Sequence, residues 1–149
     1  MRRLRQLKKD GMYYVSSNFH HGILEYIDEG VKNMLLEIIY SAVEKFHITI
    51  KNLCVMDTHF HIEIKTIGDT NLSDVMKYIK QRFTQWLNRR IGKKGTAWED
   101  RFFSRIIETI CALIKVFNYI KDDSVKAGIV KRPEDYKYYR VLDENLTTL

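Results

Sequence analysis

Cysteine is scarce in this sequence, and long apolar runs are missing. The two cysteines, Cys54 and Cys111, each lie in an apolar neighbourhood, which predicts two buried thiols in a reducing compartment rather than a disulfide. No apolar run approaches the roughly 20 residues that a membrane-spanning helix needs. The basic N-terminus is not followed by the apolar segment of a secretory signal. We therefore expect a cytoplasmic protein.

Linkers, repeats and low-complexity segments are missing as well, and proline occurs once, at Pro133. The 149 residues are 45% hydrophobic and 30% charged, which is typical of a soluble globular protein with a substantial core. We therefore expect residues 1–149 to form one domain. The formal net charge of +6 favours an anionic partner, although many basic proteins bind no nucleic acid.

Residues 59–65 alternate strictly between polar and apolar side chains, which is the pattern of a half-buried strand with two different faces. The apolar side chains would face a core, and the polar ones would lie together on the other face of a sheet. His59 and His61 would then be next-but-one neighbours, able to bind one metal ion without distorting the backbone. Solvated or hydrogen-bonded histidines are commoner than metal ligands, and two imidazoles leave a metal site incomplete. A third ligand has to come from another part of the chain.

Six further segments have the patterns of regular structure. Some are rich in β-forming residues, and the others carry apolar residues at helical spacing. A slipped alternation at Lys51 and Asn52 predicts a β-bulge, and the short connection at 57–58 predicts an antiparallel hairpin. Together with the histidine segment, the predicted strands are 12–17, 48–56, 59–65 and 102–107, and the predicted helices are 29–46, 71–91 and 110–121.

The order β-α-β-β-α-β is that of a ferredoxin-like sandwich, a fold of the α+β class. In that fold an antiparallel sheet carries its helices on one face, and the other face is free. The two histidines would point to the free face. The helix predicted at 110–121 would be an addition near the C-terminus.

That additional helix supplies a candidate nucleophile, Tyr119, which lies almost opposite the apolar stripe of the helix. Asp123 follows four residues later, so the two side chains lie one above the other if the helix continues for one more turn. A phenol is a poor nucleophile unless a cation or a base assists it, and a carboxylate can help to bind Mg²⁺ or Mn²⁺. By position alone, a surface tyrosine and a helix-end aspartate remain the simpler interpretation. The apolar stripe consists of Ile110, Leu113, Ile114, Phe117 and Ile120.

The segment 77–105 is strongly basic, with nine lysines and arginines against two acidic residues. The aromatic residues Trp98, Phe102 and Phe103 are interleaved with them. Basic side chains bind phosphates and aromatic rings stack on unpaired bases, so the segment predicts contact with nucleic acid. The alternative is a solvated helix face whose aromatic residues belong to the core. The basic residues are Lys77, Lys80, Arg82, Arg89, Arg90, Lys93, Lys94, Arg101 and Arg105.

Four blocks of the sequence resemble the single-tyrosine HUH transposases, which include the IS200-like insertion-sequence enzymes and the REP-associated tyrosine transposases. A His-x-His pair alone would be unspecific, whereas four blocks in the right order and spacing cover most of the chain. The blocks are YYVSS at 13–17, CVMDTHFH at 54–61, the run from Leu72 to Ile107, and YIKDDSVKAGIV at 119–130 with a Pro-x-Asp-Tyr at 133–136.

The resemblance implies a mechanism and a set of site residues. His59 and His61 would bind a divalent metal, Mg²⁺ or Mn²⁺. Tyr119 would attack single-stranded or hairpin DNA, giving a 5′-phosphotyrosine and a free 3′-OH. The residue four positions after the tyrosine, often Gln or Asn in this family, can complete the metal site, and here it is Asp123. The nine basic residues would bind the DNA.

The sequence departs from the family pattern at three places. Asp57 and Thr58 replace the usual Pro-Asn, and Ser124 replaces the usual Pro. Neither change removes a named catalytic group. The carboxylate of Asp123 is a harder, charged ligand and is compatible with Mg²⁺. An active transposase and a domesticated copy both stay open.

Three other functions also stay open. The first is a catalytically inactive nucleic-acid-binding module or repressor on the same fold. The second is a replication-initiator or relaxase nuclease, which a chain of this length without a helicase disfavours. The third is an unrelated two-histidine metallohydrolase, which would leave the tyrosine block unexplained. The resemblance implies a prokaryotic, nucleoid-associated protein that is either a homodimer with an exchanged tyrosine, as in insertion-sequence relatives, or a monomer, as in REP-associated ones.

Overall fold

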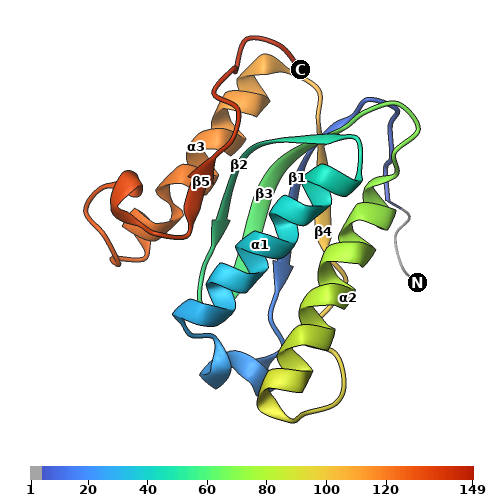
Figure 1. Cartoon of the computed structure of the whole chain (residues 1–149). Coiled ribbons are helices and arrows are strands. Elements are labelled where there is room, and N and C mark those ends of the chain that lie inside the picture. The colour runs from blue at the N-terminus through green and yellow to red at the C-terminus, as the bar shows by residue number, and fades with distance from the viewer. Residues whose placement is uncertain (1–4) are drawn as a thin grey trace.

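A five-stranded antiparallel sheet forms the centre of the structure, a computed structural model that describes residues 5–149 (Figure 1). The strands lie in the order β4-β1-β3-β2-β5. The three inner strands are β1 at Met12–Asn18, β2 at Ile48–Val55 and β3 at His59–Thr66. The edge strands are β4 at Phe103–Ile107 and β5 at Tyr139–Val141. The histidine segment is therefore the central strand of the sheet.

All four predicted strands are confirmed. β2 and β3 pair as the predicted hairpin, and a register shift between Ile50 and Asn52 is the predicted bulge. The sequence does not predict β5, because its three residues show no alternation and it is held by backbone pairing with β2. The tail after the short 3₁₀ helix η2, Pro133–Asp135, therefore adds a fifth strand beside β2.

Helices α1 and α2 lie side by side and cover one face of the sheet, as predicted (Figure 1). The 3₁₀ helix η1 at His21–Tyr26 leads into α1 at Glu29–Lys45, and α2 runs from Leu72 to Ile91 and ends at Gly92 with a φ of 67°. No helix within residues 5–149 is long and apolar enough to cross a membrane. The core under these helices includes Val31, Leu35, Ile39, Val75, Ile79 and Phe83 and, from β3, Phe60, Ile62 and Ile64.

Helix α3, Ile110–Lys126, packs against the opposite face over β2 and β3, so this face is not entirely free. It continues beyond the predicted end at residue 121, which meets the condition for stacking Asp123 on Tyr119. Ile110 and Ile114, predicted as part of the buried stripe, are 37% and 41% exposed, so that part of the prediction is wrong. The reason is that α3 faces the sheet along a line through Leu113, Phe117, Ile120 and Ser124, and the sheet does not extend to its flank.

The predicted burial of both cysteines is confirmed for Cys54 and wrong for Cys111, which is exposed. Leu113 points into the core, and a residue two positions earlier lies about 200° around the helix. Cys111 therefore faces away from the sheet.

A buried asparagine attaches α3 to the sheet. Asn52 follows the bulge in β2, and its Nδ2 donates hydrogen bonds to the Phe117 carbonyl at 2.9 Å and to the Tyr139 hydroxyl at 3.1 Å. Phe117 lies two residues before Tyr119 in α3, and Tyr139 begins β5. One side chain therefore fixes the helix that carries Tyr119 and the added strand relative to β2.

Replacing this amide should loosen α3. We expect Asn52→Ala to lower the free energy of unfolding by about 1–3 kcal/mol, because one buried and one partly buried acceptor lose their donor. Denaturant unfolding measures the change, and Asn33→Ala, on the exposed side of α1, is the control and should change it by less than about 0.5 kcal/mol. Equal effects of the two substitutions would contradict the anchoring role.

Candidate metal centre and nucleophile

Two histidines and one aspartate converge where the start of β3 meets α3. The Nε2 atoms of His59 and His61 lie 2.9 Å and 3.0 Å from the same Asp123 oxygen, Oδ2. One ligand atom from each of the three residues lies within 4.8 Å of the others, which is the spacing of a group that could hold a metal ion. The structure thus brings together the three residues predicted as metal ligands, although Asp123 follows His59 by 64 positions in the sequence.

Hydroxyl groups hold the far nitrogen of each imidazole. Thr58 Oγ1 lies 2.9 Å from His59 Nδ1, and the Tyr14 hydroxyl lies 3.3 Å from His61 Nδ1. A hydroxyl can donate to a bare Nδ1 or accept from a protonated one. The rings can therefore keep their orientation whether Nε2 carries a proton or gives its lone pair to a metal. Burial raises the pKa of Tyr14 to about 12, so its hydroxyl stays neutral in either case.

The charges of the group suit a divalent cation. Burial lowers the pKa of His61, partly offset by Asp123, so this imidazole is held neutral. Contact with His61, and less with His59, holds the pKa of the Asp123 carboxyl below its usual range. The buried Nε2 of His61 is out of line for a hydrogen bond to Asp123 despite the short distance. A neutral imidazole at His61, an ionised carboxylate at Asp123 and a buried Nε2 without a well-aligned partner fit a metal ion between them.

Tyr119 lies beside this group in the same chain. Its side chain is 54% exposed, and its ring centroid is 5.7 Å from that of His61 and 5.9 Å from that of Tyr14. The Lys126 ammonium lies 5.7 Å from the Tyr119 ring centroid. An exposed phenol, next to three candidate ligands and a cation, has the surroundings that a tyrosine nucleophile requires.

The nine predicted DNA-binding residues do not form one patch. Arg105, on β4, shares the histidine face, because it pairs with Tyr14 across the sheet. The five basic residues of α2 lie in the helix layer on the other side of the sheet, where Lys77, Lys80 and Arg101 line a surface hollow of about 710 Å³. Arg90 pairs with Asp28 instead of standing free. The other predicted residues are Arg82, Arg89, Lys93 and Lys94, all exposed.

The three aromatic residues predicted to stack on bases likewise lie on different sides of the sheet. Trp98 is 4% and Phe102 9% exposed, and Trp98 packs on Phe19 and Phe83, so neither ring is available to a base. For these two rings the core interpretation holds and the stacking prediction is wrong. Phe103 is 50% exposed on the histidine face. Phe102, the preceding residue, points to the face of the sheet that α1 and α2 cover, and for this reason the two adjacent phenylalanines differ in exposure.

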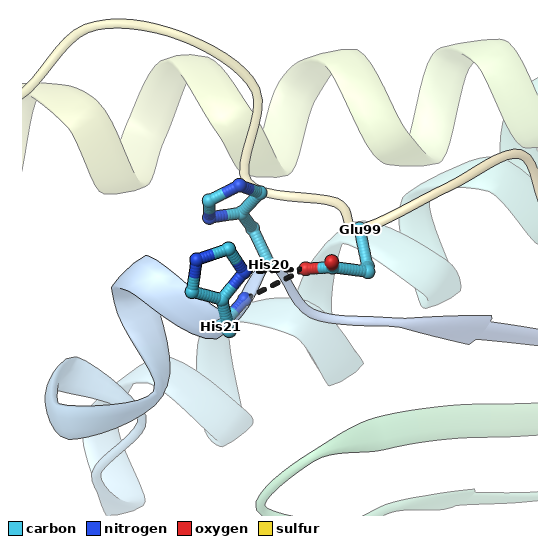
Figure 2. A group of neighbouring side chains, drawn as sticks. All are labelled: His20, His21 and Glu99. Atoms are coloured by element: carbon cyan, nitrogen blue, oxygen red, sulfur yellow. Dashed lines mark hydrogen bonds and ion pairs between the residues drawn. The ribbon is translucent and has the colours of Figure 1, made fainter.

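A second group, His20, His21 and Glu99, also has the spacing of a metal site (Figure 2). Glu99 Oε2 accepts from the His21 backbone at 2.9 Å and lies 3.1 Å from its Nδ1, and these hydrogen bonds lower the pKa of Glu99. His20 Nδ1 accepts from Gly22, and the two rings stack at 4.3 Å. In this exposed group both Nδ1 atoms already form hydrogen bonds within the protein. The group connects the loop after β1 to the loop before β4.

Comparison with known proteins identifies the family. The family model described as "Transposase IS200 like" matches residues 24–123, which include His59, His61, Tyr119 and Asp123. The chain belongs to the IS200-like transposase family. The resemblance predicted from the four sequence blocks is thus confirmed. No curated protein sequence matches this transposase.

Solved structures share the fold of this transposase. A REP-associated tyrosine transposase bound to a REP hairpin is 21% identical, with a TM-score of 0.75 over 93% of this chain and 82% of that one. A Deinococcus radiodurans R1 protein named as a transposase is 15% identical, with a TM-score of 0.51 over 82% and 97%. A bacterial tRNA(His) guanylyltransferase-like protein in complex with GTP is 10% identical, with a TM-score of 0.52 over 82% and 68%. At these identities the likeness concerns the fold.

Sequence reasoning gives no role to Glu63, which lies on the histidine face beneath α3. Both its carboxyl oxygens are buried and accept no hydrogen bond from residues 5–149, and the Oδ1 of Asn52, opposite it in register, also lacks a donor. Burial raises the pKa of Glu63 to about 8, although Lys51 opposes the shift. The alternation of β3 predicts that Glu63 lies on the polar face of the sheet. Only the position of α3 shows that this side chain is buried.

The raised pKa of Glu63 predicts a specific dependence of stability on pH. Below pH 4 the carboxyl is protonated in both states; from there to about pH 8 only the unfolded chain ionises, so stability falls as pH rises. We therefore expect the free energy of unfolding of Glu63→Gln, relative to that of the unmodified protein, to increase by on the order of 1 kcal/mol for each pH unit in this range. Unfolding at pH 5, 6.5 and 8 measures it, with the exposed Glu37→Gln as control. If the difference in unfolding free energy between the two proteins were the same at all three pH values, Glu63 would not be uncharged in the folded state.

Proposed function

We propose that this transposase cleaves and rejoins single-stranded DNA next to a hairpin through a covalent 5′-phosphotyrosine, as one HUH nuclease domain. Family membership and the fold shared with a hairpin-bound REP-associated tyrosine transposase support the proposal. The observation that carries it is the position of an exposed Tyr119 beside His59, His61 and Asp123.

His59, His61 and Asp123 would hold the divalent cation. Carboxylate oxygens favour Mg²⁺ and Mn²⁺, and imidazole nitrogens at two of the three positions are compatible with Mn²⁺. When bound, the cation would polarise the scissile phosphodiester and offset the charge that develops on it. Thr58 and Tyr14 would orient the two imidazoles from behind.

Tyr119 performs the covalent step. Its phenol loses its proton, its oxygen forms a bond to the phosphorus, and the bond from phosphorus to the 3′-oxygen breaks. The departing 3′-oxygen takes up a proton, which leaves a free 3′-OH and a 5′-phosphate joined to Tyr119. Attack by a 3′-OH on this phosphotyrosine reverses the bond changes and rejoins a strand. The Lys126 ammonium, 5.7 Å from the centroid of the Tyr119 ring, would attract the phosphate that is attacked.

The basic residues would serve different parts of the DNA. Arg105 shares the face of the candidate centre and would contact the strand being cleaved. Lys77, Lys80 and Arg101, around the hollow beside α2, and the other basic residues of that segment would hold backbone phosphates farther along the hairpin.

The covalent step has a direct test. Incubation with a labelled hairpin carrying a single-stranded flank should give a protein–DNA adduct that requires Mg²⁺ or Mn²⁺ and is lost with chelator. Tyr119→Phe should abolish the adduct, because the attacking oxygen is gone, and Tyr40→Phe, on α1, should keep it. If Tyr119→Phe formed the adduct at the normal rate, the assignment of Tyr119 as the nucleophile would be wrong. Hairpin binding without an adduct under any metal would point to an inactive binding protein instead.

The position of Tyr119 next to the ligands of its own chain leads us to propose attack in cis. A mixture of Tyr119→Phe and His61→Ala proteins should then stay inactive, because neither chain holds both a nucleophile and a complete metal group. Adduct assays on the mixture and on each variant alone measure this. Recovery of about a quarter or more of the normal adduct in the mixture would show that the tyrosine is supplied by a partner.

A further inference from the structure

Three aromatic rings form a row on the open half of the histidine face. Tyr14, on β1, is in the middle, with edge-on contacts to Phe103 at 6.1 Å and to Tyr119 at 5.9 Å between ring centroids. Tyr14 also contacts the ring of His61. The row therefore leads from the edge strand β4 directly to the candidate metal centre.

The outer end of this row is open to solvent. Phe103 is 50% exposed, whereas Phe102, the residue before it, is buried in the core. Helix α3 lies over β2 and β3, and within residues 5–149 no helix covers Phe103. A large aromatic side chain left exposed beside a reactive group is a feature of ligand-binding surfaces.

Cations flank the row at both ends. The Arg105 guanidinium lies 6.0 Å from the Phe103 ring centroid, and the Lys126 ammonium 5.7 Å from that of Tyr119. Neither cation forms an ion pair with a carboxylate among the described residues, and each is left to an outside anion. A row of aromatic rings with a cation at each end matches a nucleotide chain, which offers flat bases and phosphates, better than an apolar peptide.

We propose that Phe103 is the stacking site for one unpaired base of the substrate, next to the phosphate that Tyr119 attacks. The base lies on the exposed face of Phe103, Arg105 takes the adjoining phosphate, and Tyr14 supports the ring through its edge-on contact. The strand is thereby held with its next phosphate towards His59, His61 and Asp123. This inference rests on the proposed function and names the part of the substrate that the site recognises.

The test uses the full chain with Tyr119→Phe, which keeps the ring but stops cleavage, in the presence of Mg²⁺. The probes are a blunt hairpin, the same hairpin with a single-stranded flank, and flanked hairpins with one abasic position each. We expect Phe103→Ala to weaken binding of the flanked hairpin roughly 10-fold, and Phe103→Trp to restore it. Ile129→Ala, at an equally exposed apolar residue three positions after the end of α3, is the matched control.

The abasic series decides whether the ring binds a base. At one flank position, an abasic site should weaken binding by the parent protein by the same 10-fold. It should not weaken binding by Phe103→Ala any further. Equal weakening of every probe by Phe103→Ala would overturn the proposal, since the ring would then act on the fold. No effect of Phe103→Ala, in a protein that prefers flanked to blunt hairpins, would overturn the stacking site alone. No preference for flanked hairpins would also remove the single-strand part of the proposed function.

Discussion

One carboxylate oxygen joins the two halves of the candidate site. Oδ2 of Asp123 lies about equally far from two imidazole nitrogens, 2.9 Å and 3.0 Å away, and those imidazoles belong to β3. The contact ties a helix to the central strand at the point where the strand begins. Since Tyr119 lies one turn earlier on the same helix, the positions of the candidate nucleophile and of the candidate metal group both depend on this contact.

The packing beneath the site supports that contact from a distance. The bulge in β2 places Asn52 in the core, where its amide binds the backbone of α3 and the first residue of β5. Nearby, the buried Glu63 accepts no hydrogen bond from residues 5–149 and stays protonated to about pH 8. The face that carries the histidines is thus polar along β3 and β2, and closing α3 over it leaves several polar groups buried. Among these groups the Asn52 amide stabilises the contact with α3, whereas the Glu63 carboxyl is buried without a hydrogen bond from the described residues, at a cost in stability.

Much of this arrangement follows from local sequence patterns. The alternation around His59 and His61 is enough to place both imidazoles on one face, and helical spacing is enough to align Tyr119 with Asp123. What local patterns do not contain is which surface another element covers. For that reason Cys111, Ile110 and Ile114 are wrongly predicted as buried, Trp98 and Phe102 as accessible, and β5 is missed altogether. The distribution of the basic residues over both sides of the sheet likewise depends on tertiary structure.

The placement of Tyr119 and Asp123 on one helix also limits how the protein can move. A helix behaves as a rigid rod, with a rise of about 1.5 Å per residue, so the backbone positions of the two residues cannot be displaced independently. Any shift of α3 along or away from the sheet that withdraws the nucleophile also removes a carboxylate from the two imidazoles. A movement of α3 would therefore assemble or dismantle the ligand set and the position of Tyr119 together.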